Sequence, residues 1–133
     1  MKSVMWTCAA VFAALPLNAQ ALNLDCAVNP GSNNLGWVSD RYLFEIDGQA
    51  GTAKVNDSQI EFYVKKPVDG VVEKYTDKVI VVHWRYDVLS STAKRFKIEF
   101  RGTYFRDTER FSLWGKPATY VETYAAQGRC TEN

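Results

Sequence analysis

The amino-acid sequence predicts an all-β fold, a small antiparallel barrel of about eight strands, with a two-sheet β-sandwich as the alternative. Val, Ile, Tyr, Phe, Trp and Thr, the residue types that favour strands, are abundant along residues 22–133. Short runs in which apolar and polar residues alternate are separated by clusters of Gly, Pro, Asn and Asp, a pattern typical of barrels and sandwiches. Cys26 and Cys130, near opposite ends of this region, would tie the first strand to the last. Such a link favours closure, because a closed barrel has no exposed strand edges.

The alternating runs define the expected strands in chain order. They are 22–28, 41–47, 51–55, 59–65, 71–75, 78–88, 95–105, 111–114 and 119–129. Turn-forming residues occupy the breaks at 29–34, 47–48, 56–58, 67–70, 89–93, 107–109 and 115–117. The second to fourth runs are expected to form an antiparallel meander. The run 78–88 is apolar on both faces, which predicts a central strand that is partly covered on both sides.

Side-chain parity within these runs predicts which residues form the core. The expected core residues are Phe44, Ile46, Ile60, Phe62, Ile80, Val82, Trp84, Phe96, Ile98 and Phe100. Gly102 falls on the inner face of its run, where it allows a bend or a bulge. The many inward-facing aromatic residues favour an interior filled by side chains over one that holds a ligand cavity.

The first 21 residues have the three parts of a secretory signal peptide. Lys2 provides the positive charge, residues 4–17 the apolar segment, and Ala19-Gln20-Ala21 the cleavage site. The apolar segment is shorter than the roughly 20 residues of a spanning helix. We therefore expect a single domain over residues 22–133 that is periplasmic or secreted, with no stable membrane insertion after cleavage of the signal peptide.

Cleavage would remove Cys8 and leave Cys26 and Cys130. In an oxidising compartment, two cysteines at opposite ends of a small domain predict one intramolecular disulfide. A loop of this length corresponds to about 4 to 5 kcal/mol in the chain-entropy model. Two free thiols or an intermolecular bond are the alternative.

Charge and polar motifs limit the function classes. The chain has 16 basic and 15 acidic residues, and cleavage removes the basic Lys2, so the domain is neutral and nucleic acid is not an expected partner. Neither a cofactor nor a metal is expected, because His83 is the only histidine and no closely spaced ligand set accompanies it. No catalytic residue is assigned. A small hydrolase centred on His83 stays open as an alternative, although no Gly-x-Ser-x-Gly motif supplies a nucleophile.

Aromatic residues outside the expected core are better candidates for a binding surface. By parity or position, Trp37, Tyr63 and Phe105 lie outward or in loops, and Trp114 directly precedes a turn. Exposed aromatic residues often anchor protein partners, although they also cover the ends of barrels. The stretch 94–116 contains seven Lys or Arg residues and three acidic ones, which indicates a basic, solvated face or an anion site.

The layout of these motifs is similar to that of exported bacterial proteins. The resemblance rests on Ala19-Gln20-Ala21, Cys26, Phe44-Glu45-Ile46-Asp47, Ala53-Lys54-Val55 and Gly128-Arg129-Cys130. Over most of residues 22–133, the chain resembles small uncharacterised exported proteins of Gram-negative bacteria. In architecture alone it resembles the periplasmic c-type lysozyme inhibitors, which are small disulfide-tied β-barrels, and no inhibitory residues are carried over.

Three functions are compatible with these observations. The first is an exported, non-catalytic binding or inhibitor module that recognises another exported or envelope protein through an aromatic and basic surface. The second is the hydrolase centred on His83, and the third is a structural or envelope-stress accessory protein. The binding module is preferred, because a filled barrel of this length leaves little room for a catalytic cleft.

Overall fold

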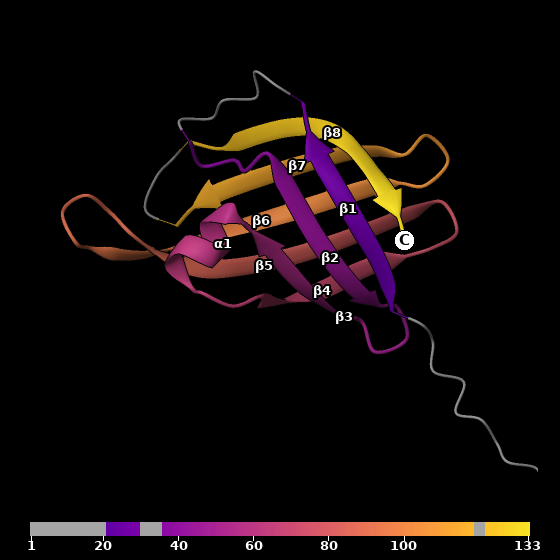
Figure 1. The fold of residues 1–133 in the computed structure, drawn as a ribbon, viewed down its shortest axis with the longest axis horizontal. Coiled ribbons are helices and arrows are strands. Elements are labelled where there is room, and N and C mark those ends of the chain that lie inside the picture. The colour runs from indigo at the N-terminus through magenta and orange to yellow at the C-terminus, as the bar shows by residue number, and fades with distance from the viewer. Residues whose placement is uncertain (1–20, 30–35, 119–121) are drawn as a thin grey trace, which may run out of the picture.

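The computed structural model describes residues 21–29, 36–118 and 122–133, and these form a closed barrel with one short helix (Figure 1). The strands are β1 (Leu22–Val28), β2 (Arg41–Asp47), β3 (Thr52–Asp57), β4 (Val68–Tyr75), β5 (Val79–Leu89), β6 (Arg95–Phe105), β7 (Arg110–Pro117) and β8 (Tyr124–Glu132). Each strand pairs antiparallel with the next one along the chain, and β8 pairs with β1. The predicted all-β antiparallel barrel is confirmed, and the alternative two-sheet sandwich is wrong.

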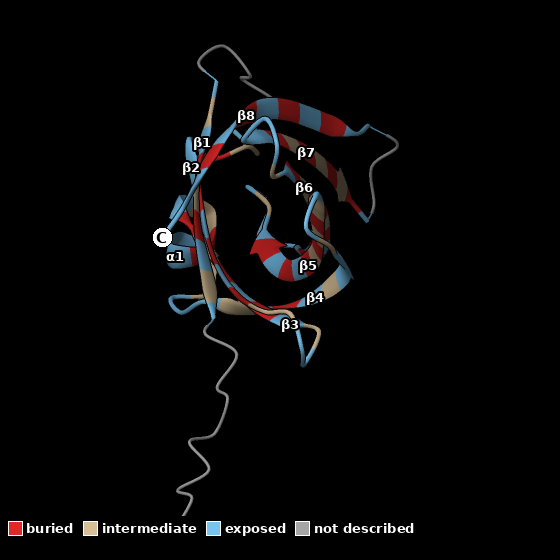
Figure 2. Ribbon diagram, turned by 90° about the vertical axis from the view of Figure 1, so that its right-hand side faces the viewer, coloured by how far each residue is buried: buried red, intermediate tan, exposed pale blue. Residues whose placement is uncertain are grey.

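Alternation along the strands places one set of side chains inside the barrel. In β2, for example, Tyr42 and Phe44 are buried between exposed neighbours. Figure 2 shows the same alternation of buried and exposed bands on other strands. Inside, Trp84 stacks on Phe100 with the ring centroids 5.6 Å apart and meets Phe44 edge-on at 5.3 Å. Every expected core residue except Phe62 is buried, so parity located the core correctly wherever the chain is a strand.

Two glycines make room for these rings. A Cβ atom on Gly102 would lie 3.0 Å from the ring of Phe111 and 3.2 Å from that of Trp84. A Cβ atom on Gly115 would lie 2.5 Å from the ring of Phe100, which is closer than carbon atoms approach. Both strands therefore contain glycine where the facing ring occupies the space of a side chain.

The first and last strands meet at a seam that a disulfide closes. Cys26 on β1 and Cys130 on β8 are in register, and their Sγ atoms are 1.97 Å apart. The backbones approach closely here, since a Cβ atom on Gly128 would lie 1.9 Å from the carbonyl oxygen of Ala27. The expected intramolecular pairing of the two cysteines is confirmed.

Most of the segment 59–65 is helical, so the prediction of a strand there is wrong. α1 (Ser58–Tyr63) follows β3 directly, so Asn56 and Asp57 end β3 and do not form a turn. The helix begins at Asp57, whose side chain accepts a 2.8 Å hydrogen bond from the backbone N–H of Ile60. This N-cap satisfies a backbone donor at the start of the helix, which favours the helix over an extended run.

The helical conformation also makes the prediction for one expected core residue, Phe62, wrong. Ile60 is fully buried, whereas Phe62 is 74% exposed. Residues i and i+2 share a face of a strand, but they lie about 200° apart around a helix, so only one of them can point at the core. Val64 and Lys65 both donate to the carbonyl of Ile60, and Lys65 adopts a left-handed φ of 67°, which ends the helix.

The remaining strands differ from the predicted runs at their ends only. β2 and β6 have the predicted bounds, while β4 begins at Val68 and β7 continues to Pro117. The last strand, β8, runs beyond Cys130 to Glu132. Residues 119–121 of the last predicted run and residues 1–20 of the predicted signal peptide lie outside the described residues.

The two ends of the barrel are built differently, and we name them for what they contain. The terminus end carries Ala21, Asn133 and the turns 48–51, 76–78 and 106–109. The helix end carries residues 36–40, α1, residues 64–67 and the connection 90–94 between β5 and β6. In Figure 1 the terminus end, marked by the C, is on the right and α1 is on the left.

Candidate functional site

A groove at the helix end separates the chain that follows α1 from the β5–β6 hairpin. Its volume is about 460 Å³. Tyr63, Val64 and Val68 line one side. The hairpin lines the other side with Arg85, Tyr86, Asp87, Val88, Leu89, Arg95 and Lys97. Of the four aromatic residues predicted to bind, Tyr63 is therefore in this groove, where it is half-buried.

Large apolar side chains are exposed beside the groove. Phe62 is the most exposed large apolar residue of the described chain, and Leu89 on the hairpin is 49% exposed. The ring of Phe62 meets that of Tyr63 edge-on, with the centroids 4.9 Å apart. Exposed aromatic and aliphatic groups around a groove are typical of surfaces that bind another protein.

Basic residues outnumber acidic residues along the groove at the helix end. Arg85, Arg95 and Lys97 line the groove together with one acid, Asp87, whose carboxylate is 3.9 Å from the Lys97 ammonium. Within the described residues, neither Arg85 nor Arg95 takes part in an ion pair. The adjoining connections add three exposed lysines, Lys65, Lys66 and Lys94. The predicted basic stretch thus contributes its first three cations to this end.

A buried carboxylate, that of Asp57, caps the start of α1 where the helix follows β3. Asp57 is 6% exposed, and its Oδ1 caps the helix, while its Oδ2 has no hydrogen-bond partner among the described residues. Burial raises the pKa of Asp57 to about 6, although hydrogen bonds from backbone groups of Ile60 and Gln59 act in the opposite direction. Burial and then the charge of Asp57 also raise the pKa of Tyr86. The helix end therefore contains an ionisable group whose charge is poorly solvated.

Two of the other predicted binding residues are packed against the protein. Trp37 is half-buried at the helix end, edge-on to Phe96 with centroids 5.6 Å apart and stacked on Tyr124 at 6.2 Å. Trp114 is half-buried on the outer wall of the barrel, and the guanidinium of Arg101 lies 5.9 Å from its ring centroid. Both rings cover other side chains, which leaves less of each for a partner.

The last predicted binding residue belongs to the opposite end. Phe105 is 42% exposed and lines a groove of about 540 Å³ near the turn 106–109. The charges there are nearly balanced, with Lys78 and Arg110 against Asp107. The four predicted residues therefore do not form one surface, since only Trp37 and Tyr63 share an end of the barrel.

The site contains residues that sequence reasoning missed, and the reasons differ. Phe62 belongs to the expected core only if the segment 59–65 is a strand, and it forms part of α1 instead. Arg85 lies in the predicted strand 78–88 and Leu89 in the predicted turn 89–93, and neither position indicates a groove. A signal for the helix was present, because Asn56-Asp57-Ser58 is rich in N-cap residues and precedes the acidic Glu61. No comparable signal marks the groove, which depends on where two distant segments lie.

His83 lies away from both grooves, on the outer wall of β5. Its Nε2 is 3.3 Å from Oε2 of Glu99 on β6. In the part of the chain that the structure describes, no hydrogen bond joins His83 to a hydroxyl or thiol side chain. Residues 21–29, 36–118 and 122–133 also contain no group of three or more His, Cys, Asp or Glu residues arranged to hold a metal ion. No helix among these residues is long and apolar enough to cross a membrane.

Comparison with known proteins gives no relative. The chain matches no protein-family model, and no curated protein or solved structure is significantly similar to it.

Proposed function

We propose that this protein is an exported, non-catalytic binding or inhibitor module that recognises another exported or envelope protein through its helix end. The observation that carries the proposal is Phe62, an aromatic side chain 74% exposed on a six-residue helix. Beside it lies a groove whose two arginines, Arg85 and Arg95, form no ion pair with any residue that the structure describes. Apolar groups held in water at such exposure favour association, because burying them against a partner removes them from solvent.

The disulfide supports the exported location that the proposal assumes. Structural disulfides persist in oxidising compartments and are rare where thiols are kept reduced. Cys26 and Cys130 are buried and joined at the seam of the barrel, as expected of a structural bond. A periplasmic or secreted location agrees with the signal peptide expected from residues 1–21.

The hydrolase alternative receives less support. His83 interacts with Glu99 on an outer wall, and the interior of the barrel is occupied by stacked rings such as those of Trp84 and Phe100. Acid–base catalysis with a side-chain nucleophile requires that nucleophile within hydrogen-bond reach of the base. The His83–Glu99 pair has the geometry of a surface ion pair instead.

A capture experiment tests the proposed function. The purified, disulfide-bonded protein is immobilised, and proteins retained from the exported fraction of the source organism are quantified by mass spectrometry. Phe62→Ser is compared with Leu43→Ser, which removes an apolar side chain 41% exposed on the outer wall of β2. We expect a retained protein that Phe62→Ser loses and Leu43→Ser keeps. An identical retained set for all three proteins, or no retained protein, would contradict recognition through the helix end.

A further inference from the structure

At the helix end, β5 extends beyond the point where its pairing with β4 stops. β6 pairs with β5 along its whole length, from Val79 to Leu89. β4 pairs with β5 from Tyr75–Ile80 only as far as Gly70–Trp84. Among the described residues, the last five residues of β5, Arg85–Leu89, therefore pair with a strand on one side only. In Figure 1 the loop that joins β5 to β6 extends beyond α1, in agreement with this overhang.

The backbone of this stretch presents hydrogen-bonding groups to the open side. At the tip of the hairpin, Ser90 N–H donates to the carbonyl of Lys94 at 2.8 Å, so even-numbered residues of β5 face β6. By alternation, the N–H and C=O groups of Asp87 and Leu89 face away from β6. Among the described residues, no strand pairing or turn hydrogen bond reaches these two residues from that side. An unpaired edge of this kind is a template for another strand.

The groove runs along this edge of β5. The side chains on the inner face of the edge are apolar, and those on the outer face are mostly charged. Tyr86 and Val88 point toward the inner face, where Tyr63, Val64 and Val68 close the groove. Arg85, Arg95 and Lys97 lie on the outer face of the hairpin, together with Asp87, whose carboxylate is paired with Lys97. A strand added here would alternate in the same way, with one set of side chains against the apolar wall and the other beside the cations.

We propose that the groove receives an extended segment of the partner protein in which acidic and apolar residues alternate, and that this segment adds as a strand to the edge Arg85–Leu89. This inference rests on the proposed function and specifies how the partner is recognised. Main-chain hydrogen bonds to Asp87 and Leu89 hold the segment, and its carboxylates pair with Arg85 and Arg95, which have no ion pair of their own among the described residues. Its apolar side chains cover the half-buried Tyr63, Val64 and Val68.

A synthetic peptide tests strand addition directly. The probe is an acetylated, fluorescein-labelled peptide of Val-Glu repeats, and its affinity is measured by fluorescence anisotropy. We expect binding to the Val-Glu peptide and at least about tenfold weaker binding to the matching Val-Lys peptide. Equal affinity for the two peptides, or no binding of the Val-Glu peptide, would overturn the acidic class of ligand.

N-methylated peptides separate strand addition from charge attraction. Only every second N–H of an added strand points at β5, so methylating one set of amides should lower affinity at least about tenfold, and methylating the other set should leave it within about threefold. In an antiparallel strand the sensitive amides are those of the Glu residues, because paired residues point to the same face. Equal sensitivity of the two sets would show that the peptide does not bind as a strand.

Variants of the protein locate the binding edge. Arg85→Gln with Arg95→Gln should weaken binding of the Val-Glu peptide by at least about tenfold. The matched control is Arg110→Gln with Arg129→Gln, which removes the same charge from exposed, paired positions on β7 and β8. Equal loss in both double variants would overturn the assignment to the groove, and thermal unfolding confirms that each variant is folded. If a partner is captured through Phe62 while the peptide does not bind, the proposed function stands and only this inference fails.

Discussion

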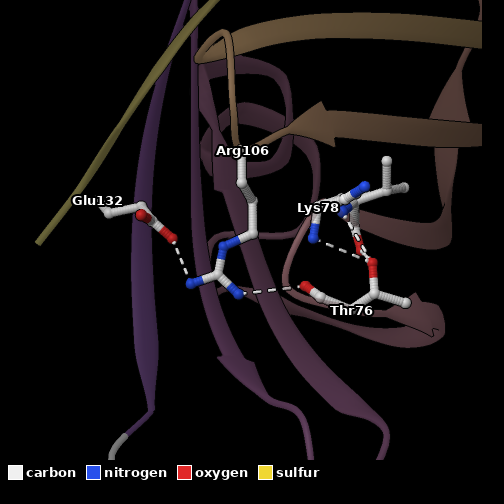
Figure 3. Close-up of polar contacts among 5 residues, drawn as sticks. Thr76, Lys78, Arg106 and Glu132 are labelled. Atoms are coloured by element: carbon white, nitrogen blue, oxygen red, sulfur yellow. Dashed lines mark hydrogen bonds and ion pairs between the residues drawn. The ribbon is translucent and has the colours of Figure 1, made fainter.

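At the terminus end, short turns carry the chain between strands, and hydrogen bonds join the turns to one another. At the helix end, a six-residue helix with a single buried residue, Ile60, sits beside a groove. Figure 3 shows the terminus end, where the guanidinium of Arg106 lies between the carboxylate of Glu132 at 2.9 Å and the carbonyl of Thr76 at 3.2 Å. α1 is joined to the segment 36–40 by two hydrogen bonds, from the Ser58 hydroxyl to Ser39 Oγ at 3.0 Å and from the Gln59 side-chain amide to the carbonyl of Gly36. Its own cap leaves one oxygen of Asp57 unpartnered within the described residues.

This difference indicates where the molecule can open and where it can bind. Polar groups at the terminus end are satisfied within the turns, for example through the hydrogen bonds from Thr76 N–H to the carbonyl of Val79 and from Gly51 N–H to that of Asp47. The bond from Arg106 to the carbonyl of Thr76 joins two of these turns. The helix end exposes Phe62 and Leu89, and one side of the last part of β5 pairs with no strand of the described chain. Segments with few buried contacts open locally at low free energy, and binding segments are commonly drawn from them. The proposed recognition surface therefore lies at the end of the barrel opposite the hydrogen-bonded turns.

The disulfide should stabilise both ends together, because it lies on the seam between them. Removing it with Cys26→Ala and Cys130→Ala should lower the free energy of unfolding by about 4 kcal/mol, the value expected for a loop that spans most of the domain. Urea denaturation of the variant and of the wild-type protein measures the loss, with the reduced wild-type protein as the control. Hydrogen exchange should speed up at both ends. A loss below about 1 kcal/mol would mean that strand pairing alone closes the barrel.

The two large apolar residues of α1 should differ sharply in their effect on stability. Ile60→Ala should cost about 2 to 4 kcal/mol, since Ile60 is fully buried, whereas Phe62→Ala should change stability by less than about 0.5 kcal/mol. Urea denaturation gives both values. Hydrogen exchange on Ile60→Ala should be faster around residues 58–65 and unchanged at the turns of the terminus end. Equal effects of the two substitutions would contradict the helical register.

The same two residues explain how far the sequence could predict the fold. Alternation located β2 and β6 to the residue, because neighbouring strands support an extended chain on both sides there. In the segment 59–65, alternation and helix capping compete, and Ile60, Phe62 and Val64 satisfy the strand pattern equally well. The N-cap at Asp57 favours the helix, and the alternation of apolar and polar residues carries no information about this cap.

The candidate site was less predictable for a different reason. Tyr63 and the basic stretch were identifiable from their residue types. The groove exists because the first residues of β4, from Val68, pair with β3 only, and pairing of β4 with β5 begins at Gly70. That divergence depends on packing between segments far apart in the chain. Trp37 was predictable as an aromatic residue outside the core that either binds a partner or covers an end of the barrel. Its local sequence does not indicate that it packs on Phe96 and Tyr124.

Asp57 should make the stability of the helix end depend on pH. Its folded-state pKa of about 6 lies above the ordinary value of 3.8, so the folded protein holds the proton more tightly than the unfolded chain does. This contribution is fully present below about pH 4 and is lost as the pH rises through about 6, on the order of 2 to 3 kcal/mol in total. Urea denaturation at a series of pH values, compared between the wild-type protein and Asp57→Asn, isolates it.

Asp57→Asn is the suitable comparison because asparagine caps helices as well as aspartate does but does not ionise. The variant should therefore be more stable than the wild-type protein at neutral pH and about equal to it near pH 4. Parallel profiles for the two proteins would mean that the Asp57 carboxylate is solvated. Asp57→Ala should be less stable than Asp57→Asn by about 1 kcal/mol, because it also removes the cap.

The smallest expected effect is at the terminus end. Arg106→Ala removes the ion pair with Glu132, the hydrogen bond to Thr76 and a guanidinium 5.7 Å from the ring centroid of Tyr75. Because Arg106 and Glu132 are partly exposed, water offsets much of this loss, and we expect a cost of about 1 kcal/mol in urea denaturation. Arg106→Lys retains the charge but loses the guanidinium that reaches two acceptors. Its stability should therefore lie between those of the wild-type protein and Arg106→Ala.

Neither variant should change binding of the Val-Glu peptide at the opposite end. A loss of peptide affinity in Arg106→Ala would show that the two ends are coupled, and it would contradict the separation of stability from recognition.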